Sequence, residues 1–208
     1  MARSAGKPIV VFKSNVSETS ARIAKSHTAA LSNDDRIVTG AFRQAGIVGV
    51  KSVRQMVLCA KSLQLPPLLG DRLAVLSLSG GYSVILGDAC EEYGFKCPSL
   101  PRELLDKIES FRRGGVIRMA NPMDFGDVHS IEGLAFAVEH CLKLDHIDGM
   151  VLALFYDPEI AKLLGQGNDN TQQMLDFLDE TMNACNKPIA LSFLSERQYI
   201  EAYKKISP

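Results

Sequence analysis

A histidine in a run of small side chains is the first candidate for chemistry in this sequence. His27 lies within Ala24–Ser32, where serine, threonine and alanine neighbours predict an exposed loop between a strand and a helix. A neutral imidazole nitrogen is nucleophilic near pH 7, so His27 could accept a transferred group in a covalent step. A lone histidine in a loop is more often a solvated polar residue, and the residues alone leave that interpretation open.

A second candidate is the segment Ser79-Gly80-Gly81-Tyr82, which joins a predicted strand directly to a predicted helix. Such a junction points unpaired backbone N–H groups and the positive end of the helix dipole at one spot, and glycines let an anion approach closely. The segment could therefore seat a phosphate. The alternative is a tight turn in which Ser79 caps the helix and no ligand binds. The pattern G-x-G-x-x-G is not completed, because Gly87 is a poor third glycine.

The third candidate is Ala120–Asp127, which contains Asn121-Pro122-Met123-Asp124 and follows a predicted strand. The residue before a proline is held extended, which restricts Asn121. Asp124 could accept backbone hydrogen bonds or cap the next helix, as Asx residues commonly do. Because open α/β sheets bind ligands beyond the carboxyl ends of their strands, this position makes Asn121 and Asp124 candidates for supporting a ligand.

The histidines and cysteines do not form a metal-binding pattern. His129, His140 and His146 are not at ligand spacing from one another or from a cysteine, so no metal site is expected. The cysteines are five in number, lack C-x-x-C spacing and lie mostly in apolar helical patterns. That usage is typical of free, buried thiols in a reducing compartment. They are Cys59, Cys90, Cys97, Cys141 and Cys185.

Composition excludes several classes of protein. Of 208 residues, 46% are hydrophobic and 23% are charged, which is typical of a globular protein and argues against a disordered chain. The net charge of −1 offers no general attraction for nucleic acid or an anionic membrane. The longest apolar stretches, Pro8–Phe12 and Met150–Tyr156, are far shorter than the roughly 18 residues of a membrane helix. Since Met1–Lys7 has no apolar signal core, we expect a cytoplasmic protein with no membrane or nucleic-acid partner.

The elements that must position these residues alternate along the chain. Short β-branched runs are followed by longer amphipathic segments, which is typical of βαβ units and a mostly parallel sheet. Strands are expected at 8–13, 47–50, 73–78, 115–119, 149–155 and 188–193. Helices are expected at 34–45, 52–63, 82–93, 101–110, 130–144 and 171–186.

Two prolines divide this pattern into two α/β parts. Residues 66–70 form a predicted Pro-rich linker, because Pro66 and Pro67 forbid a helix and Gly70 precedes the next strand. Residues 71–208 carry four predicted parallel strands of a flavodoxin-like sheet with helices on both faces, without a last strand. Residues 1–65 offer only two strands and form an incomplete second lobe, which is too small to be stable alone and could favour a homo-oligomer.

The order and spacing of five segments carry a family resemblance. The segments are Lys7-Pro8-Ile9-Val10-Val11-Phe12-Lys13-Ser14, Ser26-His27-Thr28-Ala29-Ala30-Leu31, Ala41-Phe42-Arg43-Gln44-Ala45-Gly46, Ser79-Gly80-Gly81 and Asn121-Pro122-Met123-Asp124. Together they resemble NDP-forming acyl-CoA synthetases, the group that includes ADP-forming acetyl-CoA synthetase and succinyl-CoA synthetase. On this resemblance, 1–65 is the C-terminal part of a succinyl-CoA-ligase flavodoxin-like domain, and 71–208 is a second such domain.

The resemblance implies a site and a reaction. His27 would become phosphorylated, with Ser26 and Thr28 supporting its loop. Ser79, Gly80, Gly81 and Tyr82 would form a helix N-terminus that faces the phosphohistidine, with Asn121 and Asp124 as further support. The implied reaction is acyl-CoA + phosphate + NDP ⇌ carboxylate + CoA + NTP, run through an acyl phosphate and then a phosphohistidine.

The resemblance also implies partners. CoA, ADP or ATP, phosphate and Mg²⁺ would serve the complete enzyme, and this chain would bind none of them by itself. A CoA-binding Rossmann domain and an ATP-grasp nucleotide-binding domain or subunit have no counterpart here, so we do not expect activity from this chain alone. Ala29 stands where the family usually has glycine, which could stiffen the loop.

Two other interpretations stay open. One is a non-catalytic binding, regulatory or assembly module with the same fold. The other, weaker one is an unrelated flavodoxin-like protein that binds a phosphorylated cofactor at Ser79-Gly80-Gly81, supported by fold analogy alone.

Overall fold

The computed structural model describes residues 6–28, 34–111, 118–126, 130–155 and 168–194. The chain divides into two compact units, an N-terminal unit, Met1–Gln64, and a C-terminal unit, Leu65–Pro208. Each is an α/β assembly with a parallel sheet. Within the described residues, no helix has the length and apolar character needed to cross a membrane.

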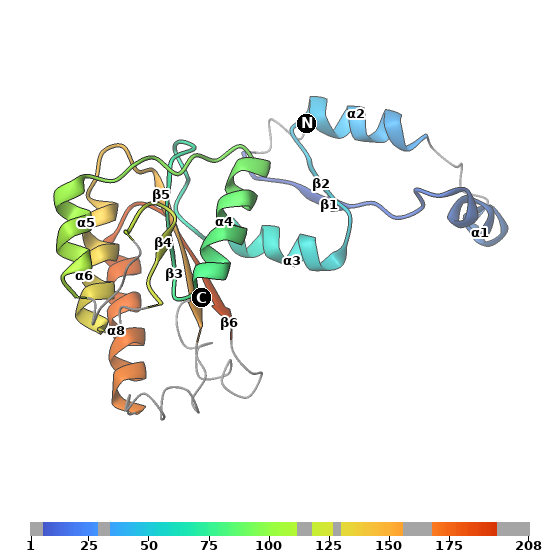
Figure 1. Ribbon diagram of the computed structural model, residues 1–208. Helices are drawn as coiled ribbons and strands as arrows, with labels where there is room; N and C mark the ends of the chain where they lie inside the picture. The colour runs from blue at the N-terminus through green and yellow to red at the C-terminus, as the bar shows by residue number, and fades with distance from the viewer. Residues whose placement is uncertain (1–5, 29–33, 112–117, 127–129, 156–167, 195–208) are drawn as a thin grey trace. The chain divides into compact units, whose positions relative to one another are not determined.

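The N-terminal unit is built on a pair of parallel strands. β1 (Val10–Phe12) pairs with β2 (Val48–Val50), with Val10 opposite Val48 and Phe12 opposite Val50. Helices α2 (Asp35–Ala45) and α3 (Val53–Ser62) lie on opposite sides of this pair (Figure 1). The first helix, α1 (Glu18–Thr28), extends away from the strands.

Local sequence explains where these helices begin and end. The Asp34 side chain accepts a hydrogen bond from Arg36 N at 2.9 Å, and Ser52 Oγ accepts one from Gln55 N at 3.1 Å, so each caps the first turn of its helix. Gly46 ends α2 in the left-handed region at φ 71°, where glycine carries no steric penalty.

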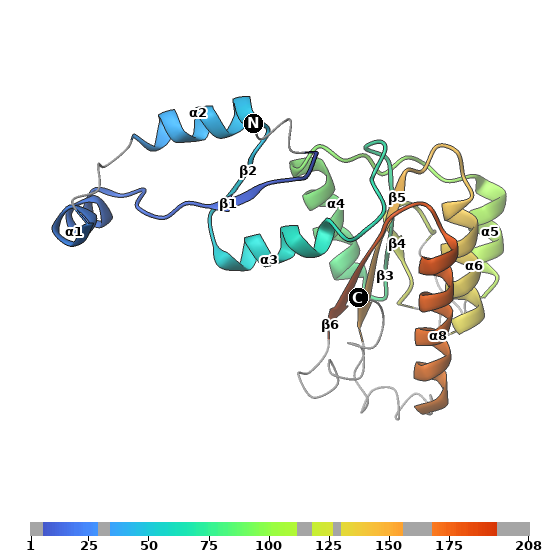
Figure 2. The ribbon, with the colours of Figure 1, turned by 180° about the vertical axis from the view of Figure 1, so that it is seen from behind.

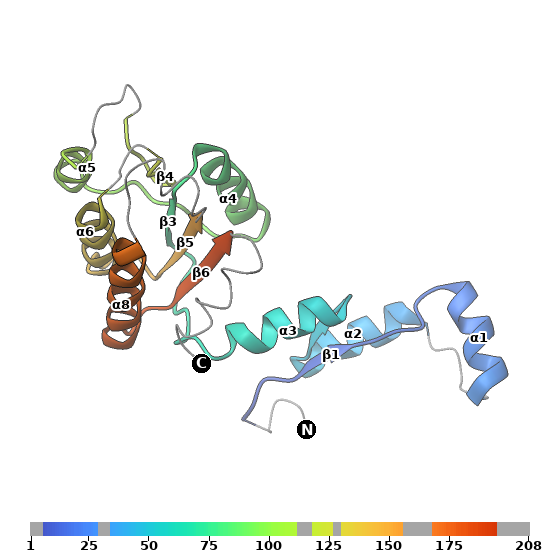
Figure 3. The same cartoon turned by 90° about the horizontal axis from the view of Figure 1, so that it is seen from below.

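The C-terminal unit contains a four-stranded parallel sheet. The strands are β3 (Leu73–Ser77), β4 (Met123–Asp124), β5 (Gly149–Phe155) and β6 (Ile189–Leu194). They lie in the order β4-β3-β5-β6, which counted within this unit is 2-1-3-4, the flavodoxin-like arrangement. The helices are α4 (Gly80–Glu92), α5 (Arg102–Glu109), α6 (Ile131–Leu142) and α8 (Asn168–Ala184). Helices α5, α6 and α8 cover one face of the sheet, and α4 lies on the other (Figure 3).

The hydrophobic core lies in the C-terminal unit. Every residue of β3 is buried, as expected for a central strand of a sheet covered on both faces. The larger cluster packs the sheet against α5, α6 and α8, and it includes Leu76, Ile108, Val138, Leu152 and Leu178. A smaller cluster joins Leu73 and Val75 of β3 to Cys90 of α4. Figure 2 shows the helices on the two faces of this sheet from behind. The predicted α/β, flavodoxin-like fold class is confirmed.

An ion pair joins the starts of β3 and β5. Arg72 Nε and N donate to Asp148 Oδ2 at 2.8 and 2.9 Å, and Arg72 Nη2 donates to Oδ1 at 2.6 Å. The hydrogen bonds from the Arg72 side chain and backbone lower the pKa of Asp148 to about 2. Gly70 completes the contact, because a Cβ at that position would collide with the Asp148 carboxylate.

Two expected elements differ from the structure. Helix α1 covers residues predicted as loop, and its start is explained by a reciprocal pair: Ser17 Oγ accepts from Ser20 N at 3.2 Å, and Ser20 Oγ accepts from Ser17 N at 3.1 Å. The strand predicted at 115–119 is absent at its described residues, 118 and 119, and Met123–Asp124 pairs with β3 instead. Residues 115–117 and the segment after β6 lie outside the described residues.

A side chain takes the place of that expected strand. Asn121 Oδ1 accepts a hydrogen bond from Val75 N at 2.8 Å, and its Nδ2 donates to Leu73 O at 2.8 Å and Pro98 O at 3.0 Å. The edge of β3 is therefore satisfied by an amide group over its first half and by β4 only at its end.

Candidate functional site

The start of α4 is the centre of the candidate site in the C-terminal unit. Ser79 is the N-cap, in an extended conformation, but its side chain makes no capping hydrogen bond. Its own N–H donates to Ser77 Oγ at 3.2 Å. Among the described residues, none accepts a hydrogen bond from the N–H groups of Gly80, Gly81 or Tyr82. These donors form the positive end of the helix dipole, where an anion is favoured.

A carboxylate already lies beside this helix end. Asp124 stands opposite Ser77 at the carboxyl end of β3, and its Oδ1 accepts from Gly126 N at 2.9 Å. A Cβ on Gly80 would lie only 2.5 Å from Asp124 Oδ2, so only glycine lets the carboxylate come this close. Negative charge at a helix N-terminus is stabilising, but it would repel a phosphate bound at the same place.

Two buried serines hold the turn, and the sequence reasoning did not single them out as site residues. Ser77 is 1% exposed and accepts from Ser79 N, while Ser83 is 7% exposed. Ser83 Oγ donates to Met123 O at 3.1 Å and so ties the first turn of α4 to β4. The sequence offers only a weak indication of this role for Ser83, namely its position four residues after the N-cap, on the side of α4 that faces the sheet.

The other predicted support residues do not gather at one place. Asp124 lies at the carboxyl end of β3, where a ligand is expected, whereas Asn121 lies beside the first half of the same strand and bonds only to backbone groups. Tyr82, in the first turn of α4, is 36% exposed. Asn121 therefore has a structural role in completing the sheet edge.

Ser26, His27 and Thr28 form the last residues of α1 in the N-terminal unit. The predicted loop is thus wrong for Ala24–Thr28, and residues 29–33, including Ala29, lie outside the described residues. Ser26 Oγ donates to Ile23 O at 2.7 Å, which shows how a small polar side chain is accommodated within a helix. The C-terminal end of a helix carries partial negative charge and favours cations there.

Burial disfavours the thiolate form of two of the five cysteines. All five are free; Cys90 and Cys141 are buried, and the others are partly buried. Burial raises the pKa of Cys141 to about 12, and burial together with the neighbouring Cys90 raises the pKa of Cys97 to about 12. Among the described residues, no three His, Cys, Asp or Glu side chains come together in a way that could hold a metal ion.

The architecture is that of an α/β protein with a flavodoxin-like sheet and a strand-Gly-Gly-helix junction at its carboxyl edge. Residues 1–63 match the family model for the "Succinyl-CoA ligase like flavodoxin domain". The ADP-forming acetate–CoA ligase II of Archaeoglobus fulgidus is 38% identical over 109 residues, which are 52% of this chain and 16% of that protein. The alpha subunit of ADP-forming acetate–CoA ligase II of Pyrococcus furiosus is 29% identical over 118 residues, 57% of this chain and 26% of that subunit.

A solved structure extends the likeness to nearly the whole chain. The dinucleotide-forming acetyl-coenzyme A synthetase 1 of Ca. Korarchaeum cryptofilum, in complex with phosphate and ADP, superposes with a TM-score of 0.77 at 26% identity. The alignment covers 98% of this chain and 43% of that one. The chain is thus similar to ADP-forming acetate–CoA ligases, as the sequence segments indicated, and it spans about a quarter or less of the length of these two curated relatives.

Proposed function

We propose that this chain supplies the phosphoryl-carrying histidine and a phosphate seat of an NDP-forming acyl-CoA synthetase. The observation that carries the proposal is the family-model match over residues 1–63, which includes Ser26-His27-Thr28, together with similarity to a synthetase over nearly the whole chain. His27 is the carrier in this proposal. Ser26 and Thr28 support it.

The proposed chemistry proceeds in three balanced steps. A phosphate oxygen attacks the acyl carbon, and the thiolate of CoA leaves, which forms an acyl phosphate. An imidazole nitrogen of His27 then attacks phosphorus, and the carboxylate leaves. Finally an oxygen of the NDP takes the phosphoryl group from the histidine, which forms NTP and restores the imidazole. Each transfer depends on holding a doubly charged group with oriented N–H donors.

The start of α4 is suited to be the phosphate seat. Its first N–H groups, on Gly80, Gly81 and Tyr82, have no acceptor among the described residues, and Ser79 leaves its own hydroxyl uncommitted to a cap. Backbone donors at a helix N-terminus are suited to phosphate because they need no reorganisation when the anion arrives. The Ser83 bond to β4 would keep this turn in place as the charge moves.

The proposal requires further domains. A CoA-binding Rossmann domain and an ATP-grasp domain or subunit would supply the CoA and nucleotide sites, with Mg²⁺ accompanying the nucleotide, and we propose a cytoplasmic location for the assembly. The names of related subunits fit this arrangement, since the Pyrococcus furiosus relatives are alpha subunits.

Phosphorylation of the histidine can be tested directly. The chain is incubated with a nucleotide-binding subunit of a related synthetase and NTP labelled at the γ-phosphate. We expect acid-labile, base-stable label on His27 that is lost in His27→Asn. The matched control is His140→Gln. His140 is a half-buried histidine of the C-terminal unit that contacts Phe136 O in the same unit, so its replacement should leave the label on His27 intact. Label that persists in His27→Asn would refute the assignment.

One observation favours a second candidate, a non-catalytic binding or assembly module. The Asp124 carboxylate lies against Gly80, where a phosphate would have to bind. In this alternative, the Asp124 carboxylate itself supplies the negative charge that stabilises the N-terminus of α4, and no phosphate binds there. Asp124→Asn then lowers stability by about 0.3–1 kcal/mol without producing phosphate binding. If the phosphate seat is real, the same variant binds phosphate several-fold more tightly than the parent chain, as measured by calorimetric titration.

A further inference from the structure

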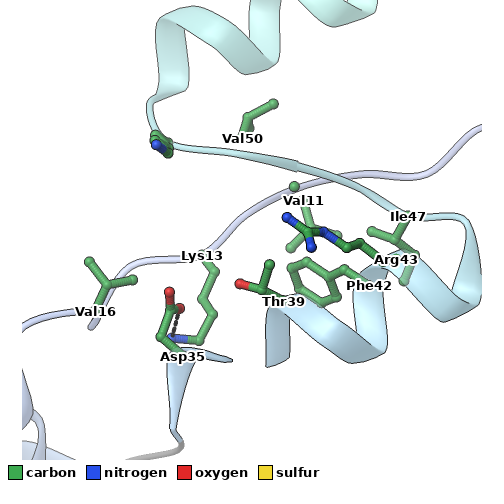
Figure 4. Close-up of a pocket in the computed structure, with 11 residues that line it drawn as sticks. Val11, Lys13, Val16, Asp35, Thr39, Phe42, Arg43, Ile47 and Val50 are labelled. Carbon is green, nitrogen blue, oxygen red and sulfur yellow. Dashed lines mark ion pairs between the residues drawn. The ribbon is translucent and has the colours of Figure 1, made fainter. Parts of the chain in front are cut away.

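A pocket lies in the N-terminal unit, between α2 and the β1-β2 pair (Figure 4). Its volume is about 450 Å³, within the range of pockets that hold small organic ligands. None of its lining residues was a candidate for the acyl-transfer site. They are Val11, Lys13, Val16, Asp35, Thr39, Phe42, Arg43, Ile47, Gly49, Val50 and Lys51.

One wall of the pocket is apolar. The Phe42 ring reaches from α2 toward β2, where Gly49 leaves room for it: a Cβ on Gly49 would lie 3.2 Å from Phe42 Cδ2. Val11 on β1 and Ile47 before β2 extend the same surface (Figure 4). A ligand with an aliphatic or aromatic body would remove this surface from water, which is favourable in proportion to the area covered.

Three cations and one acid line the same pocket. Lys13 Nζ pairs with Asp35 Oδ1 at 3.2 Å and also donates to Asn15 O at 3.2 Å, so its charge is balanced within the protein. The side chains of Arg43 and Lys51 form no hydrogen bond or ion pair with the part of the chain that the structure describes. Two positive charges therefore remain uncompensated beside an apolar wall.

The place of these cations in the fold is also informative. Lys13 directly follows β1 and Lys51 directly follows β2, so both stand at the carboxyl ends of parallel strands. Arg43 comes from the last turn of α2, and Figure 4 shows its side chain extending beneath the strands. The two lysines therefore stand at the carboxyl edge, where open α/β sheets place their ligands, whereas Arg43 comes from the helix that precedes β2.

We propose that this pocket binds an organic carboxylate with an apolar body. The apolar body lies on Phe42 and Val11, and the carboxylate is attracted by the uncompensated charges of Arg43 and Lys51 in the same lining. A neutral ligand of the same shape gains only the apolar contact. An inorganic anion gains only the charge contact. The proposal does not depend on the His27 and Gly80-Gly81 assignments.

The test is a titration of the full chain, labelled with ¹⁵N, by 4-phenylbutyrate, followed in amide NMR spectra. We expect saturable shifts at Gly49 and Val50, and weaker binding by about three- to tenfold in each of Arg43→Gln and Lys51→Gln. Both side chains stand at exposed positions, so neither change disturbs packing. Arg54→Gln is the matched control, because Arg54 is an exposed cation on α3 outside the pocket lining.

Two parallel titrations separate the parts of the proposal. 4-Phenylbutanol should bind more weakly than the acid, and inorganic phosphate should give no saturable shift at Gly49. Equal binding of the alcohol, equal loss in Arg54→Gln, or no saturation by the acid would each overturn the site. Bound acid should also slow amide exchange in β1 and β2 of the parent chain, since a ligand stabilises the state that binds it.

Discussion

The two units are built from the same kinds of elements but differ in how much they bury. In the C-terminal unit, the sheet lies between helices on both faces, and residues such as Leu152 and Val138 are fully buried. In the N-terminal unit, no described residue is buried at all. Its exposed large apolar side chains include Phe12, Val16, Ile23, Ile37, Val48, Val53, Met56, Val57, Leu58 and Leu63.

The difference follows from strand number. A two-stranded sheet presents two open edges and offers each helix a surface only two strands wide. Helices α2 and α3 have apolar side chains at suitable spacing, yet neither contains a buried residue. A helix is stabilised mainly by what its apolar face packs against. Well-formed helices and strands therefore do not by themselves produce a hydrophobic core.

The largest expected effect of this difference is on amide hydrogen exchange in the full chain. Amides of β1 and β2 should exchange at least about a hundredfold faster than those of β3 and β5, after correction for intrinsic rates, because their hydrogen bonds are opened without breaking a packed core. Mass spectrometry of peptides from each unit measures both at once. Similar protection in the two units would mean that the exposed apolar surface is covered in solution.

The next effect is on the free energy of unfolding. Leu152→Ala in β5 removes a fully buried side chain and should cost about 2–5 kcal/mol, through lost burial and the cavity that remains. Val48→Ala in β2 changes a side chain that is 47% exposed and should cost less than about 0.5 kcal/mol. Urea denaturation followed by circular dichroism compares the two variants. A large cost at Val48 would contradict the contrast between the units.

The sequence predicted the elements of the C-terminal unit better than their pairing. Strands β3, β5 and β6 were found because continuous apolar runs mark buried parallel strands. Strand β4 was misplaced because the edge of β3 is partly satisfied by the Asn121 side chain, a long-range bond that no local pattern reveals. Helix α1 was missed because its small polar residues resemble a loop.

The candidate sites show the same limit. The Gly80-Gly81 junction was visible because a strand, two glycines and a helix are adjacent in the chain. The close approach of Asp124 to Gly80 was not, since the two residues meet only through the register of β3 and β4. The pocket cations Lys13, Arg43 and Lys51 were likewise not singled out, because α2 and the two strands must assemble before they line one space.

The smallest effect concerns pH and the Arg72–Asp148 pair, which belongs to the C-terminal unit alone. The pKa of Asp148 is lowered to about 2, below its value near 3.9 in an unfolded chain. The pair therefore stabilises the folded state at pH values above about 4, and this contribution is lost as the pH falls from about 4 toward 2. Asp148→Asn should lower the melting temperature by several degrees at pH 7. Below pH 4, the melting temperature of the variant should fall less steeply with pH than that of the parent chain.

The matched control for this prediction is Asp71→Asn. Asp71 pairs with Lys96 at 2.6 Å, but both side chains are largely exposed, at 46% and 70%, whereas the Asp148 side chain is 11% exposed. An exposed pair is screened by water and salt and contributes little. Asp71→Asn should thus change neither the melting temperature at pH 7 nor its acid dependence appreciably. If the two variants showed the same change in melting temperature and in its pH dependence, burial of Asp148 at the starts of β3 and β5 would not be what strengthens the Arg72–Asp148 pair. The loss of stability in acid would then have to come from exposed charges, which both units carry.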